Sequence, residues 1–365
     1  MDKTEACVLL DCSAKNLATC AKRIRDGKLV AFPTETVYGL GANALDAEAA
    51  VSIFDAKKRP RTDPLIVHVT CVQDMEPLVT LTARQRCIVG HLASKFWPGP
   101  LTLIVKASEL IPSEITAGTG FVGVRVPNHK TALAFLAECG VPIAAPSANL
   151  FNHVSPTLAA HVYEDFKHAD VAVIDDGCST LGIESTVLKV EDDKLGFLRL
   201  GSLPKQEIED FVRSVDEISD LKVEYVQRRK SEHEKVEAPG QFVKHYSPYV
   251  KTYLISSNEA DKSITRAELA SAVIIDFGDK YAHLSSSVLK RVSLSDSGDL
   301  KEAMFKLYYC LRVAESVEGA KVILVVNLLD CERDGSRADS KYFDAVYDKV
   351  YRAASGEYMS LALIN

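Results

Sequence analysis

The feature that most constrains this chain is the stretch from Phe32 to Val69, where two apolar runs enclose polar and cationic residues. The first run, Leu29–Phe32, ends at Pro33, and the second, Leu65–Val69, carries His68. Short apolar runs bounded by turn residues are typical of buried strands. Between them lie the hydrogen-bonding residues Thr34, Glu35, Thr36 and Tyr38 and the cations Lys57, Lys58, Arg59 and Arg61. The pattern suits an anionic ligand, although cations that complement a helix dipole would produce it as well.

Helix and strand patterns alternate along the rest of the chain. Helical spacing over Lys15–Asp26, Asp46–Lys57 and Thr82–Phe96, with strand patterns between, predicts a mixed α/β sheet covered by helices in the first ~200 residues. Asp46 is expected to cap the second helix. From Val250 a β-α-β alternation predicts a smaller, parallel, Rossmann-like domain. With 365 residues two domains are expected, and we place them at 1–212 and 250–365, joined by a linker or lid at 213–249.

Composition excludes several classes of protein. The formal net charge of −7 does not favour a general nucleic-acid coat, although a local basic patch stays possible. The nine cysteines form no C-x-x-C pair, which argues against a zinc site and a disulfide framework. The N-terminus does not read as a signal peptide and no apolar run is long enough to span a bilayer, so the expected location is the cytoplasm. No Walker A motif is present.

Several polar residues stand at positions that suit a ligand site. Lys57 and Arg59 could converge on phosphates if the helix ends between them, or they could form a surface cluster. Arg125 alternates with apolar residues on a strand pattern, so it faces either solvent or a polar cavity. Ser147 and Asn149 follow an apolar strand directly, where ligands bind in open α/β sheets, but either could cap a helix. Ser155 before Pro156 is predicted first as a helix N-cap.

Together the motifs resemble the YrdC/Sua5 family of threonylcarbamoyl-AMP synthases. Residues 28–201 contain, in order, P-T-E-T-V-Y-G-L, K-x-R-P, P-L-I-V-H, W-P-G-P-L-T, V-R-V-P, A-P-S-A-N, S-P-T, G-I-E-S-T-V and L-R-x-G. The segment P-G-x-x-x-x-H-Y-x-P at 239–248 is similar to the linker of the longer, two-domain Sua5 type, and a C-terminal domain follows it. The resemblance implies a YrdC-like sheet around a concave cavity. It also implies an enzyme that makes threonylcarbamoyl-AMP and pyrophosphate from L-threonine, bicarbonate or CO2, and ATP.

The same resemblance implies roles for individual residues. The catalytic tetrad would be Lys57, Arg59, Ser147 and Asn149. Threonine would be held by Thr36, His68, Arg125, the backbone of Ala145, and Ser185. ATP would be held by Arg59, Asp63, Phe121, Ser147, Ser155, Arg199 and Tyr246. Mg2+ is expected with the nucleotide, and the product would pass to a separate transferase that makes t6A in tRNA, with at most a weak RNA contact and none with a membrane.

Three departures from the family pattern affect these expectations. Asp63 stands where the family often has Asn, so its carboxylate must bind the metal or turn away from phosphate. Phe121 replaces a small polar residue, so a contact there would use the main chain. Gln241–Val243 differs from the usual linker, whereas His245 and Tyr246 match it. We expect Ala238–Tyr249 to close over the site as a lid; a linker that only packs between two domains is the alternative.

Two other functions are compatible with parts of the pattern. An enzyme like HypF, which forms carbamoyl-AMP, contains a related domain, but this sequence has neither zinc-finger cysteine pairs nor an acylphosphatase-like domain. An RNA-binding module would use a basic concave face, and the net charge of −7 argues against it.

Overall fold

The structure is a computed structural model that describes residues 7–225, 236–239, 246–256, 258–260, 262–333 and 341–364. It divides into two compact units, which are described separately. The first comprises Met1–Phe151 and Ser155–Phe242, and the second comprises Asn152–Val154 and Val243–Asn365. The predicted linker residues Gln241–Val243 and His245 lie outside the described residues.

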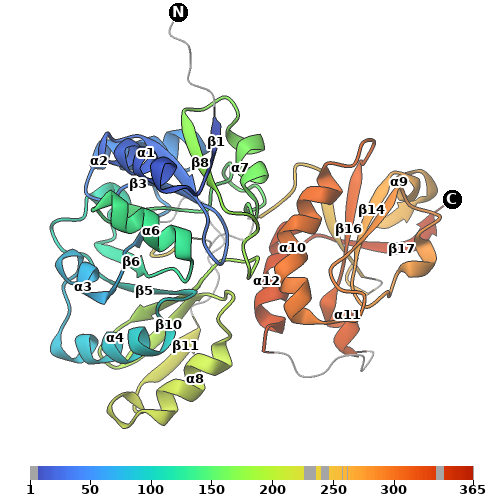
Figure 1. Ribbon diagram of the computed structural model, residues 1–365. Helices are drawn as coiled ribbons and strands as arrows, with labels where there is room; N and C mark the ends of the chain where they lie inside the picture. Colours follow the sequence, from blue (N-terminus) through green and yellow to red (C-terminus); the bar gives the residue numbers. More distant parts are fainter. Residues whose placement is uncertain are drawn as a thin grey trace, which may run out of the picture. The chain divides into compact units, whose positions relative to one another are not determined.

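The first unit contains the elements β1 to β11 (Figure 1). Its strands are β1 Val8–Asp11, β2 Leu29–Phe32, β3 Gly39–Asn43, β4 Ile66–His68, β5 Leu101–Lys106, β6 Phe121–Arg125, β7 Ile143–Ala144, β8 Val171–Asp175, β9 Thr186–Val190, β10 Lys194–Arg199 and β11 Lys222–Tyr225. Its helices are α1 Ala14–Arg25, α2 Ala47–Lys57, α3 Val72–Met75, α4 Ala83–Phe96, α5 Ser113–Thr116, α6 Lys130–Cys139, α7 Ala159–Phe166 and α8 Lys205–Ser214, with 3-10 turns η1 Glu76–Leu78 and η2 Asp216–Ile218.

These strands form one mixed sheet in the order β1-β8-β2-β3-β7-β4-β6-β5-β9-β10-β11. Side chains of β2 alternate between its two faces. Val30 and Phe32 pack with α1 and α6, whereas Leu29 and Ala31 belong to the larger cluster that includes α2 and α4. Helices therefore cover both faces of the sheet, which confirms the predicted fold class for this part of the chain.

The second unit is built on a smaller sheet. Its strands are β12 Thr252–Ile255, β13 Ser263–Thr265, β14 Ala272–Asp276, β15 Lys290–Ser293, β16 Val322–Val326 and β17 Tyr358–Ile364. Its helices are α9 Arg266–Ala270, α10 Leu300–Glu315, α11 Leu328–Arg333 and α12 Phe343–Ala353, with the 3-10 turn η3 Ala282–Leu284. The order is β13-β17-β12-β16-β14-β15, and every strand pair described is parallel, as predicted for a Rossmann-like domain.

The domain boundary differs from the predicted one. Strand β11 pairs in parallel with β10, with Lys194 opposite Lys222, so the first unit continues beyond residue 212. Strand β11 lies at the edge of the sheet, where polar and charged side chains are common. Its sequence, K-V-E-Y, is therefore polar enough to be taken for a linker. In the second unit, the strand β13 leads directly into the short helix α9. The predicted cap is confirmed, because the Asp46 carboxylate accepts hydrogen bonds from the backbone N–H groups of Glu48 and Ala49 at 3.0 and 3.1 Å.

Among the described residues, no helix combines the length and apolar character needed to cross a lipid bilayer.

Candidate active site

The P-T-E-T segment after β2 is an ordered turn held by one hydroxyl. Thr34 Oγ1 accepts hydrogen bonds from the backbone N–H groups of Thr36 and Val37 at 3.2 Å, and it donates to the Val37 carbonyl at 2.6 Å. It also lies 2.8 Å from Thr36 Oγ1. Both threonines are buried. The turn therefore fixes Thr36, a predicted threonine ligand, beside the end of β2.

Glycine at position 39 lets the segment after β7 approach this turn. A Cβ added at Gly39 would lie 3.3 Å from the Cβ of Ala145, which is closer than most Cβ atoms come to a neighbour. Gly39 also forms an antiparallel bridge with Ser147. Ala145 N donates to the Ile66 carbonyl at 2.8 Å, so the predicted backbone contact of Ala145 with a ligand would use its carbonyl oxygen. The A-P-S-A-N and P-T-E-T motifs thus lie side by side.

Lys57 joins three members of the predicted tetrad. Helix α2 ends at Lys57, and the following Lys58 has a φ of 54°, so the chain turns sharply before Arg59. Lys57 is buried, and its Nζ donates to the carbonyl of Ser147 at 2.5 Å and to that of Asn149. A buried ammonium with carbonyl partners, unlike a surface cluster, holds the S-x-N segment in place.

Arg59 forms an ion pair with Asp63, the residue that stands where the family often has Asn. Arg59 Nη2 lies 2.9 Å from Asp63 Oδ2, and the side chains are 3% and 0% exposed. The guanidinium also donates to the carbonyls of Asp63 and Pro64, at 3.2 and 2.8 Å. Burial raises the pKa of Asp63, while the charges of Arg59 and Lys57 oppose that rise. The Asp63 carboxylate is thus turned toward an arginine, one of the two outcomes expected for it.

Arg125 and His68 end neighbouring parallel strands, β6 and β4, where they stand opposite each other. Arg125 Nη2 lies 2.7 Å from Glu35 Oε2, and Arg125 Nε donates to the Gly99 carbonyl at 3.3 Å. Burial, together with the nearby Arg125 charge, lowers the pKa of His68 to about 3. His68 is therefore neutral near pH 7 and can meet a hydroxyl group without adding charge.

Ser185 and Arg199 form a third buried group. Arg199 donates from Nε to the Ser185 carbonyl and from Nη2 to Ser185 Oγ, both at 3.0 Å. Thr102 Oγ1 lies 2.8 Å from Ser185 Oγ. Gly201 permits this approach, because a Cβ there would lie 2.3 Å from the Ser185 carbonyl carbon. Arg199 Nη1 also contacts the Pro239 carbonyl at 3.4 Å, so the start of the predicted lid belongs to this group.

Ser155 does not cap a helix, contrary to the first prediction. The next helix, α7, begins at Ala159, and its N-cap residue is Leu158. The Ser155 hydroxyl is fully buried and donates to Glu184 Oε1 at 2.6 Å. Proline is compatible both with the first turn of a helix and with non-helical, extended backbone. The S-P-T motif alone therefore does not distinguish a helix N-cap from a loop.

The two remaining predicted ATP ligands are Phe121 and Tyr246. The Phe121 ring lies beneath Lys189, whose Nζ is 4.2 Å from the ring centroid, and it lines a separate pocket of about 640 Å3 near Lys106 and Lys194. Tyr246 belongs to the second unit. Its ring is buried there, 5.4 Å from the Tyr308 ring and 5.2 Å from Lys349 Nζ.

Three further residues contact the predicted site residues. They are Glu35 on Arg125, Thr102 on Ser185 and Glu184 on Ser155. Each lies inside a motif block, but spacing along the chain does not show which side chains meet across the sheet.

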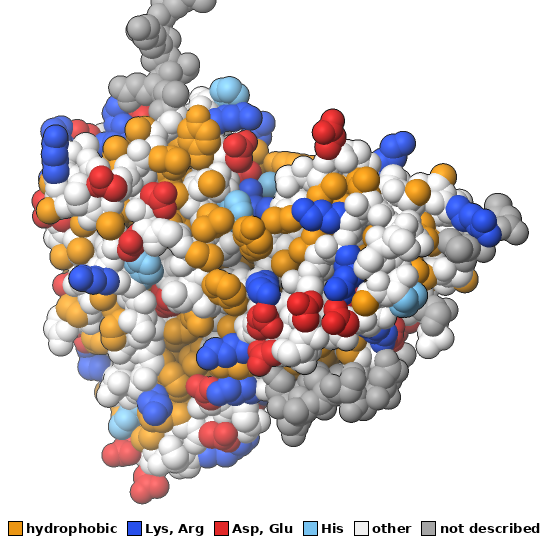
Figure 2. Space-filling view, turned by 45° about the vertical axis from the view of Figure 1, so that its right-hand side comes forward, with side chains coloured by type: hydrophobic (Ala, Val, Ile, Leu, Met, Phe, Trp, Pro, Cys, Tyr) orange, Lys and Arg blue, Asp and Glu red, His pale blue; other side chains and the backbone are white. Residues whose placement is uncertain are grey.

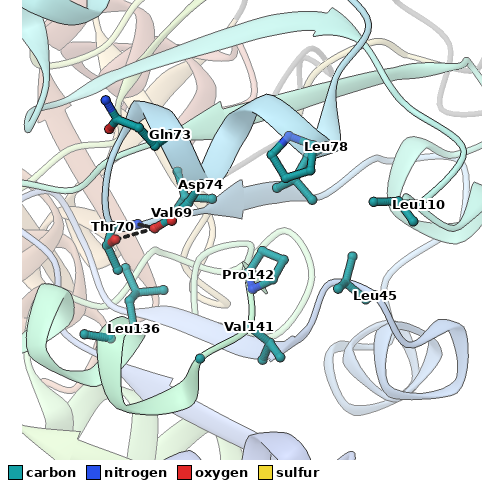
Figure 3. A pocket seen from close by; sticks show the side chains of 13 residues that line it. Leu45, Val69, Thr70, Gln73, Asp74, Leu78, Leu110, Leu136, Val141 and Pro142 are labelled. Carbon is teal, nitrogen blue, oxygen red and sulfur yellow. Dashed lines mark hydrogen bonds between the residues drawn. The ribbon is translucent and has the colours of Figure 1, made fainter.

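A second pocket in this unit is unrelated to the predicted site (Figure 3). Its volume is about 480 Å3, and apolar side chains such as Leu45, Leu78, Leu110 and Pro142 point into it around Asp74 and Thr70. None of the predicted site residues lines it. The candidate site is therefore defined by the buried polar groups and not by this cavity.

Comparison with known proteins agrees with the motifs. A model of the Sua5/YciO/YrdC family, described as telomere recombination, matches residues 22–201. A model described as the C-terminal domain of threonylcarbamoyl-AMP synthase matches residues 203–355. The Pyrococcus abyssi protein named threonylcarbamoyl-AMP synthase is 39% identical, over 82% of this chain and 85% of its own. The chain belongs to the two-domain Sua5 family.

Other Sua5 relatives extend the match. A Bacillus subtilis protein, also named threonylcarbamoyl-AMP synthase, is 40% identical over 64% of this chain and 64% of its own length. The crystal structure of P. abyssi Sua5 complexed with L-threonine superposes with a TM-score of 0.80 at 32% identity, covering 98% of this chain and 99% of the other. The Sua5 fold thus extends over both units.

Proposed function

We propose that this Sua5 protein is an L-threonylcarbamoyladenylate synthase, which makes threonylcarbamoyl-AMP and pyrophosphate from L-threonine, bicarbonate or CO2, and ATP. The observation that carries the proposal is the match along nearly the whole chain to a Sua5 structure complexed with L-threonine, with 98% of this chain covered. The buried cations of the first unit supply the chemistry that such a reaction needs. As a nucleotidyltransferase the enzyme would bind two anionic substrates and a zwitterion.

Threonine would bind at the group around Arg125. Its carboxylate suits the Arg125 guanidinium, which Glu35 and the Gly99 carbonyl hold in one orientation. Its hydroxyl would meet neutral His68, and Thr36 and Ser185 would offer further hydroxyls. These assignments, with the Ala145 carbonyl, follow the family pattern.

The nucleotide would be bound by Lys57, Arg59, Ser147, Asn149, Ser155 and Arg199, as the family pattern assigns them. Threonine carbamate would attack the α-phosphorus of ATP, and charge would build on the phosphoryl oxygens. Cations fixed before the reaction stabilise such charge without reorganising. The carbamate is already anionic, so the attack itself needs no strong base in this site. Asp63 would act through Arg59, and Phe121 and Tyr246 remain proposed contacts from the family pattern.

A Mg2+ ion would enter with the nucleotide. The described residues hold no group of three or more His, Cys, Asp or Glu side chains suited to a metal. Asp63 and Glu35 are both engaged by arginines. Mg2+ is commonly held by substrate phosphates and water with few protein ligands, which is compatible with these residues. Its chemistry would be to neutralise charge on the phosphates.

The product would serve t6A formation in tRNA through a separate transferase, and we place this role in the cytoplasm. Direct RNA binding by this chain would be weak at most. On the face shown in Figure 2, Lys and Arg side chains stand among Asp and Glu side chains, and the chain's net charge is −7. Such mixed surfaces attract a polyanion poorly.

Pyrophosphate release tests the proposal. We expect the purified protein to release pyrophosphate from ATP only when threonine and bicarbonate are both present. Release with carbamoyl phosphate in their place would indicate a HypF-like reaction. Absence of release together with binding of RNA would indicate a binding module. Either result would overturn the proposed function.

A further inference from the structure

The pocket shown in Figure 3 lies within the first unit. Its lining residues stand between positions 45 and 142, and its volume is about 480 Å3. Small-molecule sites are concave, mostly apolar and about 300–1,000 Å3 in volume. In its walls Leu78 and Leu136 are each 2% exposed, whereas Leu45 and Leu110 are 41% and 57% exposed. Large apolar side chains are thus left in contact with solvent around a hollow of the size that a small ligand fills.

Hydrogen bonds between loops hold the walls of this pocket in place. Ala44 N donates to the Pro142 carbonyl at 2.9 Å, which joins the loop before α2 to the loop after α6. Ser108 N donates to the Leu78 carbonyl at 2.9 Å, and the Ser108 hydroxyl donates to the Pro77 carbonyl at 2.8 Å. The loop before α5 is thereby joined to η1. The pocket is therefore preformed, as ligand sites usually are.

Asp74 gives the pocket a negative charge. Of the lining residues that the structure describes, it is the only one that is charged. Thr70 donates to Asp74 Oδ2 from its backbone N–H, at 3.3 Å, and from its hydroxyl. No hydrogen bond or ion pair reaches Asp74 Oδ1 from the described part of the chain. A carboxylate oxygen that still has its acceptor capacity favours a ligand that donates, and a cationic donor most of all.

The charged and the apolar parts of the pocket are separated. In Figure 3, Thr70 and Asp74 lie on one side and Leu45 and Leu110 on the other. No lysine, arginine or histidine is found among the described lining residues. An anion such as a nucleotide would therefore meet a carboxylate of like charge and no cation, which disfavours its binding here.

We propose that this pocket is a second ligand site, separate from the candidate active site, for a small amine with an apolar body. The ammonium group would lie against Asp74 Oδ1, and the apolar body would cover Leu45 and Leu110. An ion pair at an exposed carboxylate adds little affinity, whereas burial of apolar surface adds more. The apolar body therefore supplies most of the affinity, and Asp74 supplies the selectivity for a cation.

The test titrates the full-length chain, labelled at its leucine methyl groups, with hexylamine, hexan-1-ol and hexanoate, and follows the NMR signals of Leu45 and Leu110. Hexylamine should bind about twofold to fivefold more tightly than the alcohol, as an exposed ion pair allows, and hexanoate should bind most weakly. Butylamine should bind about tenfold more weakly than hexylamine, because two fewer methylene groups are buried. Asp74→Asn should remove the preference for the amine and leave the binding of hexan-1-ol unchanged.

Two variants on α6 test whether the ligands enter this pocket. Ala137 is exposed and lines the pocket, so Ala137→Phe should fill it and weaken the binding of hexylamine and hexan-1-ol about tenfold or more. Ala134→Phe, exposed on the same helix but outside the lining, is the matched control and should bind both like the wild type. If Ala137→Phe does not fold, the exposed Asp74→Asn still decides the charge preference.

Several outcomes would overturn the inference. They are unchanged hexylamine binding in Ala137→Phe, equal affinities for hexylamine and hexanoate, and self-association of the wild type that Ala137→Phe abolishes, since a second copy of the chain would then cover the pocket. Both Asp74→Asn and Ala137→Phe should keep threonine-dependent pyrophosphate release. Loss of that release in Asp74→Asn would contradict the separation of this pocket from the active site.

Discussion

Arg125 and Glu35 form an ion pair inside the first unit, with Nη2 and Oε2 2.7 Å apart and side chains 5% and 6% exposed. The pair joins two motifs that are separated by about ninety residues in sequence, P-T-E-T and V-R-V-P. It brings a carboxylate to the arginine that we expect to bind the carboxylate of threonine. Glu35 therefore fixes the direction of the guanidinium.

Replacing Glu35 should weaken the use of threonine more than that of ATP. Glu35→Gln keeps the shape of the side chain but removes the charge that orients a buried arginine, and a misplaced guanidinium should lower kcat/KM for threonine about tenfold to hundredfold. Steady-state kinetics with each substrate varied in turn would measure the effect. Glu138→Gln, exposed on α6, is the control. A larger loss for ATP than for threonine would contradict this assignment.

Lys57→Ala should abolish adenylate formation while the protein stays folded. The substitution removes a buried cation and also frees the Ser147 and Asn149 carbonyls that Lys57 holds. Positioning and charge stabilisation are both lost, so pyrophosphate release should fall about a hundredfold or more. Arg59→Ala should do the same.

The neighbouring lysine provides the control for this experiment. Lys58 is exposed, and Lys58→Ala should retain activity. Circular dichroism would confirm that each variant is folded. Unchanged threonine-dependent pyrophosphate release in Lys57→Ala would remove its proposed role.

Threonine should be preferred over serine by about tenfold or more in kcat/KM, because one methyl group in an apolar pocket is worth roughly 1 kcal/mol or a little more. Serine also has the hydroxyl that His68, Thr36 or Ser185 would meet. Discrimination therefore depends on the methyl group alone. Competition between the two amino acids, read out by mass spectrometry of the adenylates, would show the ratio, and equal efficiency would contradict the prediction.

Neutral His68 should make the fold sensitive to acid. Its pKa is about 3 in the folded protein, against an ordinary value of 6.5. Between pH 3 and pH 6.5, His68 is therefore protonated in the unfolded chain and neutral in the folded one. The free energy of unfolding then falls as pH decreases from 6.5, by about 1.4 kcal/mol per pH unit for one proton. His68→Gln should flatten this dependence. Denaturant unfolding at several pH values would measure it, and identical slopes would contradict it.

Much of the fold could be predicted because its signals are local. The apolar run of β2 and the capped helix α2 follow from neighbouring residues, and the structure has both as predicted. Strand β3 was missed, since G-L-G-A-N has low strand propensity. It forms because Gly41 lets two side chains approach; a Cβ there would lie 2.8 Å from Ile143 Cγ2. That requirement comes from the partner strand, which the local sequence does not reveal.

The same limit applies to the site. The motif blocks predicted which segments meet, and the structure brings Lys57 to Ser147 and Arg199 to Ser185. They did not reveal that Asp63 pairs with Arg59, or that Ser155 bonds Glu184. These contacts depend on side-chain directions after the chain has folded.

The most direct test of the account follows the carbon of bicarbonate. The protein would be incubated with 13C-labelled bicarbonate, L-threonine, ATP and Mg2+, and the products analysed at once by mass spectrometry, with Arg59→Ala in parallel. We predict one labelled product that contains threonine, the 13C carbonyl and AMP, absent when threonine is omitted and absent with Arg59→Ala. AMP or pyrophosphate formed without the labelled threonylcarbamoyl adduct would contradict the proposed function.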